Sequence, residues 1–183
     1  MENNTLIVSF SARNNGNCEQ IAEYIRTLLE KRTNVSVIKF SDFQIKPCGY
    51  CDYECFNKES SCPHIDDMEY QLLDKICGSD HVYFIVPNYC DHPCANFYLF
   101  NERSLCYFQN RQDRLEQYLT VPKKFIVVSG TQAESFRTAF IQHTETEPQI
   151  LYLSARNYGK ESIAGNIMKA PAAMADIESF ILM

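Results

Sequence analysis

Short apolar runs alternate with amphipathic helical patterns along the whole chain, and this alternation most constrains the fold. The apolar runs are rich in β-branched residues, which is typical of strands, and the segments between them repeat apolar residues at helical spacing. Parallel strands need crossovers, and helical crossovers cover both faces of a sheet. We therefore expect an α/β fold with a doubly wound, five-stranded parallel sheet. The expected strands are 5–10, 35–40, 81–86, 124–129 and 149–153. Two helices are expected to begin at Cys18 and near Asp66, and three more to span 95–119, 133–143 and 170–182.

Composition excludes several classes of protein. The 183 residues carry a formal net charge of −6, so there is no basic excess for binding a nucleic acid backbone. No apolar run approaches the roughly eighteen residues that a membrane span needs, and MENNTLIVSF lacks the basic start of a secretion signal. We expect one cytoplasmic domain over 1–183, in which the nine cysteines are mostly reduced.

Three loops are the candidates for a ligand site. Ligands of open parallel sheets bind outside the carboxyl ends of the strands, near the point where the strand order reverses. The loops that follow the first, third and fourth expected strands are 11–17, 87–94 and 129–135.

The first of these loops, Ser11-Ala-Arg-Asn-Asn-Gly-Asn17, has the groups that bind a phosphate monoester. A helix start presents backbone amides, and the serine, the asparagines and Arg13 add side-chain donors. The loop has neither the Gly-Lys-Ser/Thr ending of a Walker loop nor a GxGxxG pattern, which favours a mononucleotide over ATP or a dinucleotide. The same residues also suit an ordinary turn and helix start.

This loop resembles the phosphate loop of the NAD(P)H-dependent FMN reductase family, whose members have a flavodoxin-like fold. Ser11, Arg13, Gly16 and Asn17 match its Ser-x-Arg-x-x-Gly-Asn pattern, whereas Phe10 and Cys18 replace a usual glycine and threonine. The segment Pro87-Asn-Tyr89 and the later Phe100-Asn-Glu-Arg103 resemble the flavin-side loop and the helix after it. The resemblance implies FMN-binding residues in all three loops: Ser11, Arg13, Asn15, Gly16, Asn17, Cys18, Pro87, Asn88, Tyr89, Cys90, Ser129, Gly130 and Thr131.

Four cysteines form a C-x2-C-x3-C-x6-C run at Cys48, Cys51, Cys55 and Cys62. Iron–sulfur flavoproteins carry a similar run in the same connection, and this sequence differs from it by one residue in the middle gap. Family members without a cluster have a passage like the one from Pro47 to Met68. We favour no metal here, with iron–sulfur ligation by the four cysteines as the main alternative, zinc as a lesser one and a Cys48–Cys51 disulfide as a further one.

The resemblance implies an FMN-binding, NAD(P)H-dependent oxidoreductase that reduces a flavin, a quinone or another small-molecule acceptor. Such an enzyme needs no general base, because the flavin carries the hydride, so we assign no catalytic side chain. A homodimer or homotetramer is expected. Two alternatives are an iron–sulfur flavoprotein that passes electrons to a protein, and a flavodoxin-like protein that has lost FMN.

Overall fold

A computed structural model describes residues 3–49, 51–56, 62–128 and 134–183. Its central parallel strands are β1 (Asn4–Ser9), β2 (Asn34–Lys39), β3 (His81–Tyr89), β5 (Lys123–Val128) and β6 (Gln149–Leu153), in the order β2-β1-β3-β5-β6. Each parallel pair keeps a continuous register, as from Val82↔Lys123 to Pro87↔Val128. The parallel α/β architecture is thereby confirmed.

Six strands are present in the described residues rather than the expected five. The sixth, β4 (His92–Pro93), pairs antiparallel with the end of β3, where the sequence predicted a loop. The prediction was wrong because Pro87 and Asn88 look like turn residues, yet they continue β3 up to Tyr89. The reversal then takes place at Cys90 and Asp91, which both have positive φ angles, of 52° and 60°.

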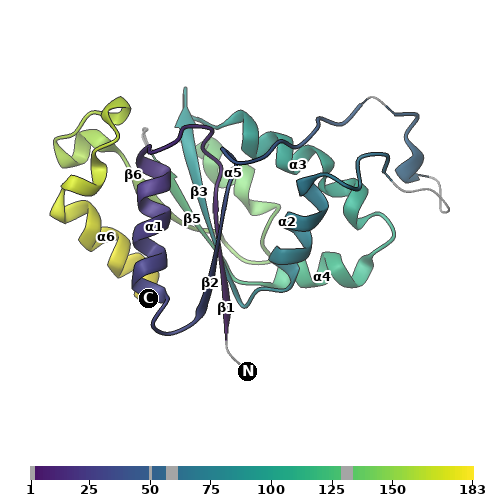
Figure 1. Ribbon diagram of the computed structural model, residues 1–183, viewed down its shortest axis with the longest axis horizontal. Coiled ribbons are helices and arrows are strands. Elements are labelled where there is room, and N and C mark those ends of the chain that lie inside the picture. Colours follow the sequence, from purple (N-terminus) through teal and green to yellow (C-terminus); the bar gives the residue numbers. More distant parts are fainter. Residues whose placement is uncertain (1–2, 50, 57–61, 129–133) are drawn as a thin grey trace.

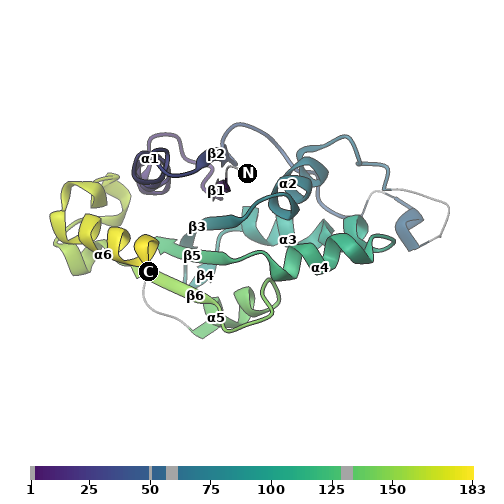
Figure 2. The same ribbon diagram turned by 90° about the horizontal axis from the view of Figure 1, so that it is seen from below.

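Helices cover both faces of the sheet (Figures 1 and 2). One face carries α1 (Asn17–Leu29) and α6 (Pro171–Leu182). The other carries α2 (Met68–Cys77), α3 (Ala95–Phe108), α4 (Gln112–Thr120) and α5 (Glu134–Ile141). Short 3-10 turns lie at Glu54–Phe56, Ala155–Tyr158, Ser162–Ala164 and Ile167–Lys169.

The helix predicted over 95–119 is two helices, α3 and α4, separated at Gln109–Arg111. The break lets Tyr118 of α4 pack back on Phe108 of α3, with ring centroids 5.1 Å apart. Arg111 covers the turn, its guanidinium 4.7 Å from the ring centre of Tyr107. Local helical periodicity continues across the break, so the sequence alone does not mark this change of direction.

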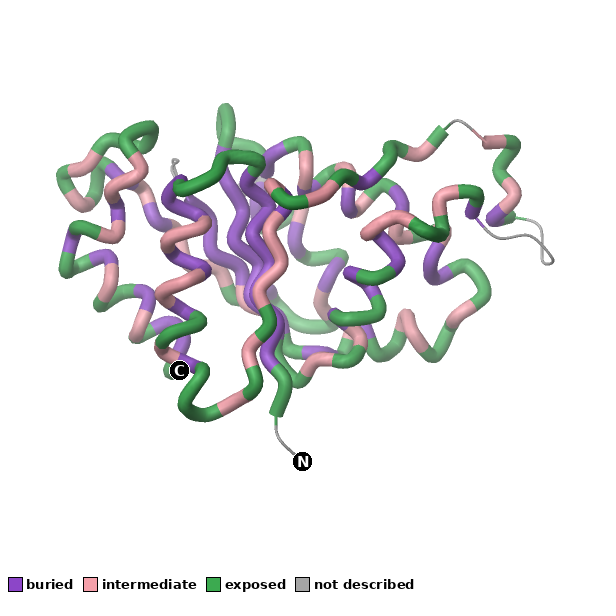
Figure 3. The backbone as a smooth tube through the Cα atoms, in the orientation of Figure 1, coloured by how far each residue is buried: buried purple, intermediate pink, exposed green. Residues whose placement is uncertain are grey.

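Buried residues concentrate in the central strands and under the helices (Figure 3). The face beneath α3 and α5 is filled with phenylalanines, including Phe125 stacked on Phe140 at 4.2 Å between centroids. Phe10, which stands where the resembled family has glycine, is fully buried against Phe40 and Phe84. Its ring therefore contributes to the core. None of the helices in the described parts is long and apolar enough to span a membrane.

Candidate functional site

The loop after β1 forms a cradle at the start of α1. Ser11 is buried, and its hydroxyl oxygen accepts a hydrogen bond from the backbone amide of Arg13 at 3.1 Å. Asn15 has a φ of 57°, and Gly16 caps the helix without any side-chain acceptor for the first-turn amides. An uncapped helix start has free amide donors and a positive dipole end, which together suit an anion.

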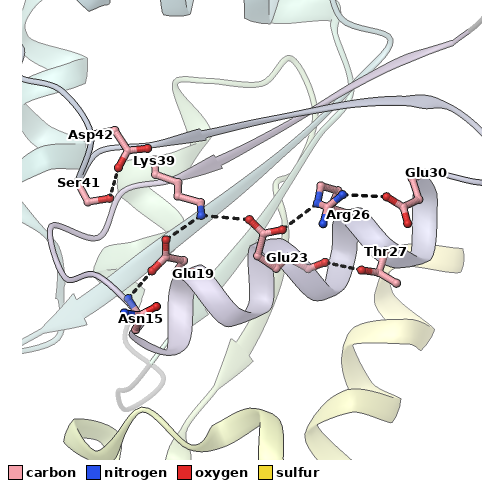
Figure 4. A network of polar contacts seen from close by, with 9 residues as sticks. All are labelled: Asn15, Glu19, Glu23, Arg26, Thr27, Glu30, Lys39, Ser41 and Asp42. Atoms are coloured by element: carbon pink, nitrogen blue, oxygen red, sulfur yellow. Dashed lines mark hydrogen bonds and ion pairs between the residues drawn. The ribbon is translucent and has the colours of Figure 1, made fainter.

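An ion-pair network holds this loop to the sheet (Figure 4). Lys39 at the end of β2 lies 2.7 Å from a carboxylate oxygen of Glu19 and 3.1 Å from one of Glu23. Glu19 also accepts a hydrogen bond from the backbone amide of Asn15. The hydrogen bond from Lys39 holds the pKa of the Glu19 carboxyl below its usual range, so the network stays charged at neutral pH.

The turn from β3 to β4 forms the second wall. Asn88 is buried and pairs with Pro93 across the hairpin, while the side chain of Tyr89 is 53% exposed. The backbone carbonyl of Pro87 accepts from the amide of Cys94 at 3.1 Å, which fixes the hairpin to the start of α3. A rigid turn thus presents an accessible aromatic ring beside the first loop.

A cavity of about 150 Å³ lies between these two walls. Most of the predicted binding residues line it: Ser11, Arg13, Gly16, Asn17, Cys18, Pro87, Asn88 and Tyr89. Asn15 lies in the cradle, where its carbonyl accepts from Gln20, but it does not line the cavity, and neither does the exposed Cys90. The predicted residues Ser129, Gly130 and Thr131 lie outside the described residues, although the preceding Val128 contributes to the wall.

A third wall comes from the turns between β6 and α6, which the sequence did not indicate. Ser162 and Ile163 line the cavity, and their carbonyls accept from Asn17 Nδ2 and Arg13 Nη2, each at 3.1 Å. Asn17 Oδ1 also accepts from the amide of Ile167 at 3.0 Å. The sequence signal that could have indicated these turns is the pair Gly159 and Gly165, because glycine favours the positive φ angles, here 63° and 60°, that tight turns need.

The two buried thiols beside the first two walls, Cys18 and Cys94, are neutral. Burial raises the pKa of the Cys94 thiol to about 11 and raises that of Cys18 further. The Cys94 thiol donates to the carbonyl oxygen of Phe10 at 3.4 Å. Neither group provides a thiolate at neutral pH. The positive electrostatic potential that Arg13 and the start of α1 create in the cavity is therefore not reduced by a negative thiolate.

The four clustered cysteines lie in the connection between β2 and α2, and none of them lines this cavity. Within the described ranges, no group of three or more Cys, His, Asp or Glu side chains is arranged to hold a metal ion. Cys62 accepts instead from Arg103 Nη2 at 3.6 Å, and the thiol of Cys106 donates to Cys55 at 3.5 Å. The iron–sulfur alternative therefore gains no support.

Arg103, a residue shared with the resembled family, stabilises this connection. It is fully buried, forms an ion pair with Asp67, and donates to the carbonyl oxygens of Lys46 at 3.0 Å and His64 at 3.1 Å. One guanidinium on α3 thus organises both ends of the cysteine-rich connection. Asp67 also caps α2 by accepting from the amide of Glu69, which agrees with the helix start expected near Asp66.

The model of the family described as NADPH-dependent FMN reductase matches residues 4–142. None of the curated proteins matches the chain. The matched range includes the first two walls of the cavity and ends before the third, so Ser162 and Ile163 lie in a part of the chain that the family model does not cover.

Solved structures share the fold at low sequence identity. The Trp repressor binding protein from Bacillus subtilis has a TM-score of 0.64 at 13% identity, with 96% of each chain covered. An azoreductase from Bacillus anthracis str. Sterne has a TM-score of 0.64 at 12% identity, covering 98% of this chain and 97% of that one. The flavoenzyme NAD(P)H:(acceptor) oxidoreductase FerB from Paracoccus denitrificans has a TM-score of 0.56 at 14% identity, with coverages of 98% and 95%.

Proposed function

The chain belongs to the NADPH-dependent FMN reductase family and is therefore a flavin-dependent oxidoreductase, and we propose that it binds FMN in the three-walled cavity and uses NAD(P)H to reduce a small-molecule acceptor. The acceptor class is a flavin, a quinone or a comparable small oxidant. The observation that carries the proposal is the convergence of Arg13 and the uncapped start of α1 on one cavity.

The donor set at α1 fits the phosphate of FMN. The first-turn amides have no side-chain cap, and the Ser11 hydroxyl and the Arg13 guanidinium add donors on the same side. Arg13 uses one donor on the carbonyl of Ile163, and its planar fork has further N–H groups for a phosphate oxygen. A volume of about 150 Å³ suits the phosphate and the adjoining chain of the cofactor better than the entire molecule.

The hairpin after β3 fits the ring side. Tyr89 offers a half-exposed aromatic face, and Pro87 and Asn88 hold the backbone beside it in a paired strand. We assign the same side to Cys90 and to Ser129, Gly130 and Thr131, as the resemblance implies. Bound FMN would supply the hydride and electron-transfer chemistry between the nicotinamide and the acceptor, so the chain itself needs to bind, orient and shield rather than supply a base.

The test is a titration of the wild-type protein and of Arg13→Ala and Arg13→Lys with FMN, followed by quenching of flavin fluorescence. A hydrogen bond to a charged group contributes about 1.5 to 3 kcal/mol, so Arg13→Ala should weaken FMN binding by roughly 10- to 100-fold. Lysine keeps the positive charge but lacks the planar set of guanidinium N–H donors, so Arg13→Lys should lose less FMN affinity than Arg13→Ala. The matched control is Arg26→Ala, which removes an arginine of α1 that pairs with Glu23 and Glu30 on the helix surface.

Wild-type protein that binds no FMN would overturn the proposal and favour the flavodoxin-like protein without flavin. If Arg13→Ala bound FMN as tightly as wild type, the phosphate of FMN would not bind at this loop. Steady-state oxidation of NADH and NADPH with quinone and flavin acceptors then identifies the preferred substrates. The subunit count, for which we propose a homodimer or homotetramer, is measured on the same samples by light scattering.

A further inference from the structure

Two thiols that are far apart in the sequence meet outside the cavity. Cys55 lies on the 3-10 turn Glu54–Phe56, and Cys106 lies near the end of α3, 51 residues later. Their sulfur atoms are 3.5 Å apart, and both residues are free thiols. A covalent bond of about 2.0 Å needs the two sulfurs to approach by about 1.5 Å, which is within the reach of side-chain rotation.

Polar contacts on both sides of the turn keep this pair together. Before it, the amide of Cys48 donates to a carboxylate oxygen of Glu102 at 3.2 Å. After it, Arg103 contacts both Cys62 and the carbonyl oxygen of His64. Glu102 and Arg103 belong to the same helix as Cys106. The contact between the two thiols is therefore flanked on both sides by polar contacts that fasten the cysteine-rich connection to α3.

We propose that Cys55 and Cys106 form a reversible disulfide by exchange with low-molecular-weight disulfides. Cys106 is half-buried and accessible to a small oxidant, whereas Cys55 is 7% exposed and is placed to attack second. The site is separate from the cavity: Cys106 lies eleven residues into α3 from Ala95, which corresponds to about 17 Å along the helix. The oxidant therefore comes from solution.

The exchange balances in two steps. Burial, with the hydrogen bond to Cys55, raises the pKa of the Cys106 thiol, so its thiolate is a minor species and the exchange should become faster as the pH rises. Once deprotonated, the Cys106 sulfur attacks one sulfur of the oxidant R–S–S–R, forming a mixed disulfide and releasing one thiolate R–S⁻. The Cys55 thiolate then attacks the Cys106 sulfur, forming the Cys55–Cys106 bond and releasing the second R–S⁻. The two protons lost by the cysteines are taken up by the released thiolates. Each cysteine is oxidised by one electron, and the small disulfide is reduced by two.

The product would fasten the cysteine-rich connection to α3. Among the described residues, Cys55 and Cys106 are the cysteine pair joined by a sulfur-to-sulfur hydrogen bond, at 3.5 Å. The neighbouring Cys62 is held by Arg103 instead. The bond would therefore form between these two residues and not between Cys48 and Cys51, the pair that their spacing suggested.

The experiment uses the full-length protein, reduced and then incubated without oxygen in buffers of fixed ratios of oxidised to reduced glutathione. Free thiols are blocked with iodoacetamide, and disulfides are located by mass spectrometry of the peptides. We expect one protein disulfide, linking Cys55 to Cys106, which forms with a single midpoint and disappears on reduction. In Cys55→Ser, Cys106 should carry one glutathione as a stable mixed disulfide.

The control is Cys77→Ser, which removes a half-buried thiol of α2 that donates to the carbonyl of Arg114. It should form the same cross-link at the same midpoint. The proposal is overturned if Cys55 and Cys106 both stay alkylated in the most oxidising buffer, if the cross-link joins other cysteines, or if wild-type protein accumulates glutathione on Cys106 without closing the bond.

Discussion

Glu69, in the first turn of α2, is a fully buried carboxyl group. Neither of its carboxyl oxygens has a hydrogen-bond partner among the described residues. Burial raises the pKa of this group from 4.5 to about 9, against the opposing effect of the Arg103 charge and with added repulsion from Asp67 and Cys62. The folded protein therefore keeps Glu69 protonated at neutral pH.

The sign of the linkage follows from this shift. Below the unfolded pKa of 4.5, both states carry the proton and no penalty arises. Above it, the unfolded chain ionises while the folded chain stays neutral, so the free energy of unfolding falls by about 1.4 kcal/mol per pH unit. The loss continues until the pH reaches about 9. Between about pH 5 and pH 7 it amounts to about 2.7 kcal/mol.

The substitution Glu69→Gln tests this reasoning because glutamine has nearly the same shape and does not titrate. We expect the two proteins to have similar stability near pH 5, and the variant to be more stable than wild type by about 3 kcal/mol near pH 7. Urea denaturation followed by circular dichroism at several pH values measures the difference, and Glu116→Gln, an exposed position of α4, serves as the control. A stability difference that does not change with pH would refute a neutral Glu69.

Two other substitutions test the third wall and the core. Asn17→Ala removes both hydrogen bonds that the Asn17 side chain makes to the turn segment 162–167. Amide hydrogen exchange in that segment should become faster, by an amount corresponding to about 1 to 3 kcal/mol of lost stability. The control Gln117→Ala, at an exposed position of α4, should leave the exchange rates unchanged. Phe125→Ala removes a fully buried ring stacked on its neighbour and should lower the free energy of unfolding by about 3 to 5 kcal/mol, while the half-exposed Leu105→Ala on α3 should cost far less in the same urea titration.

Much of the fold could be predicted because strand signals are local. Each parallel strand was predicted to within about one residue of its observed start, since a run of buried β-branched residues needs no distant partner to be recognised. The start of α2 was likewise expected near Asp66, and the helix is capped at the next residue, Asp67. The β3 end and the break after Phe108 were missed, because a strand pairing and a change of helix direction depend on contacts with distant parts of the chain.

The sequence by itself determined the parallel sheet and the donor-rich composition of the loop after β1, because both depend on residues that are neighbours in the chain. Only the tertiary structure brought Ser162 and Ile163 against Arg13 and Asn17, about 150 residues away, since turns without periodicity do not indicate what they pack on. It also decided that Cys55 meets Cys106 rather than a cysteine of its own run. A thiol pair depends on which side chains face each other in space, and the packing of a loop on α3 sets that.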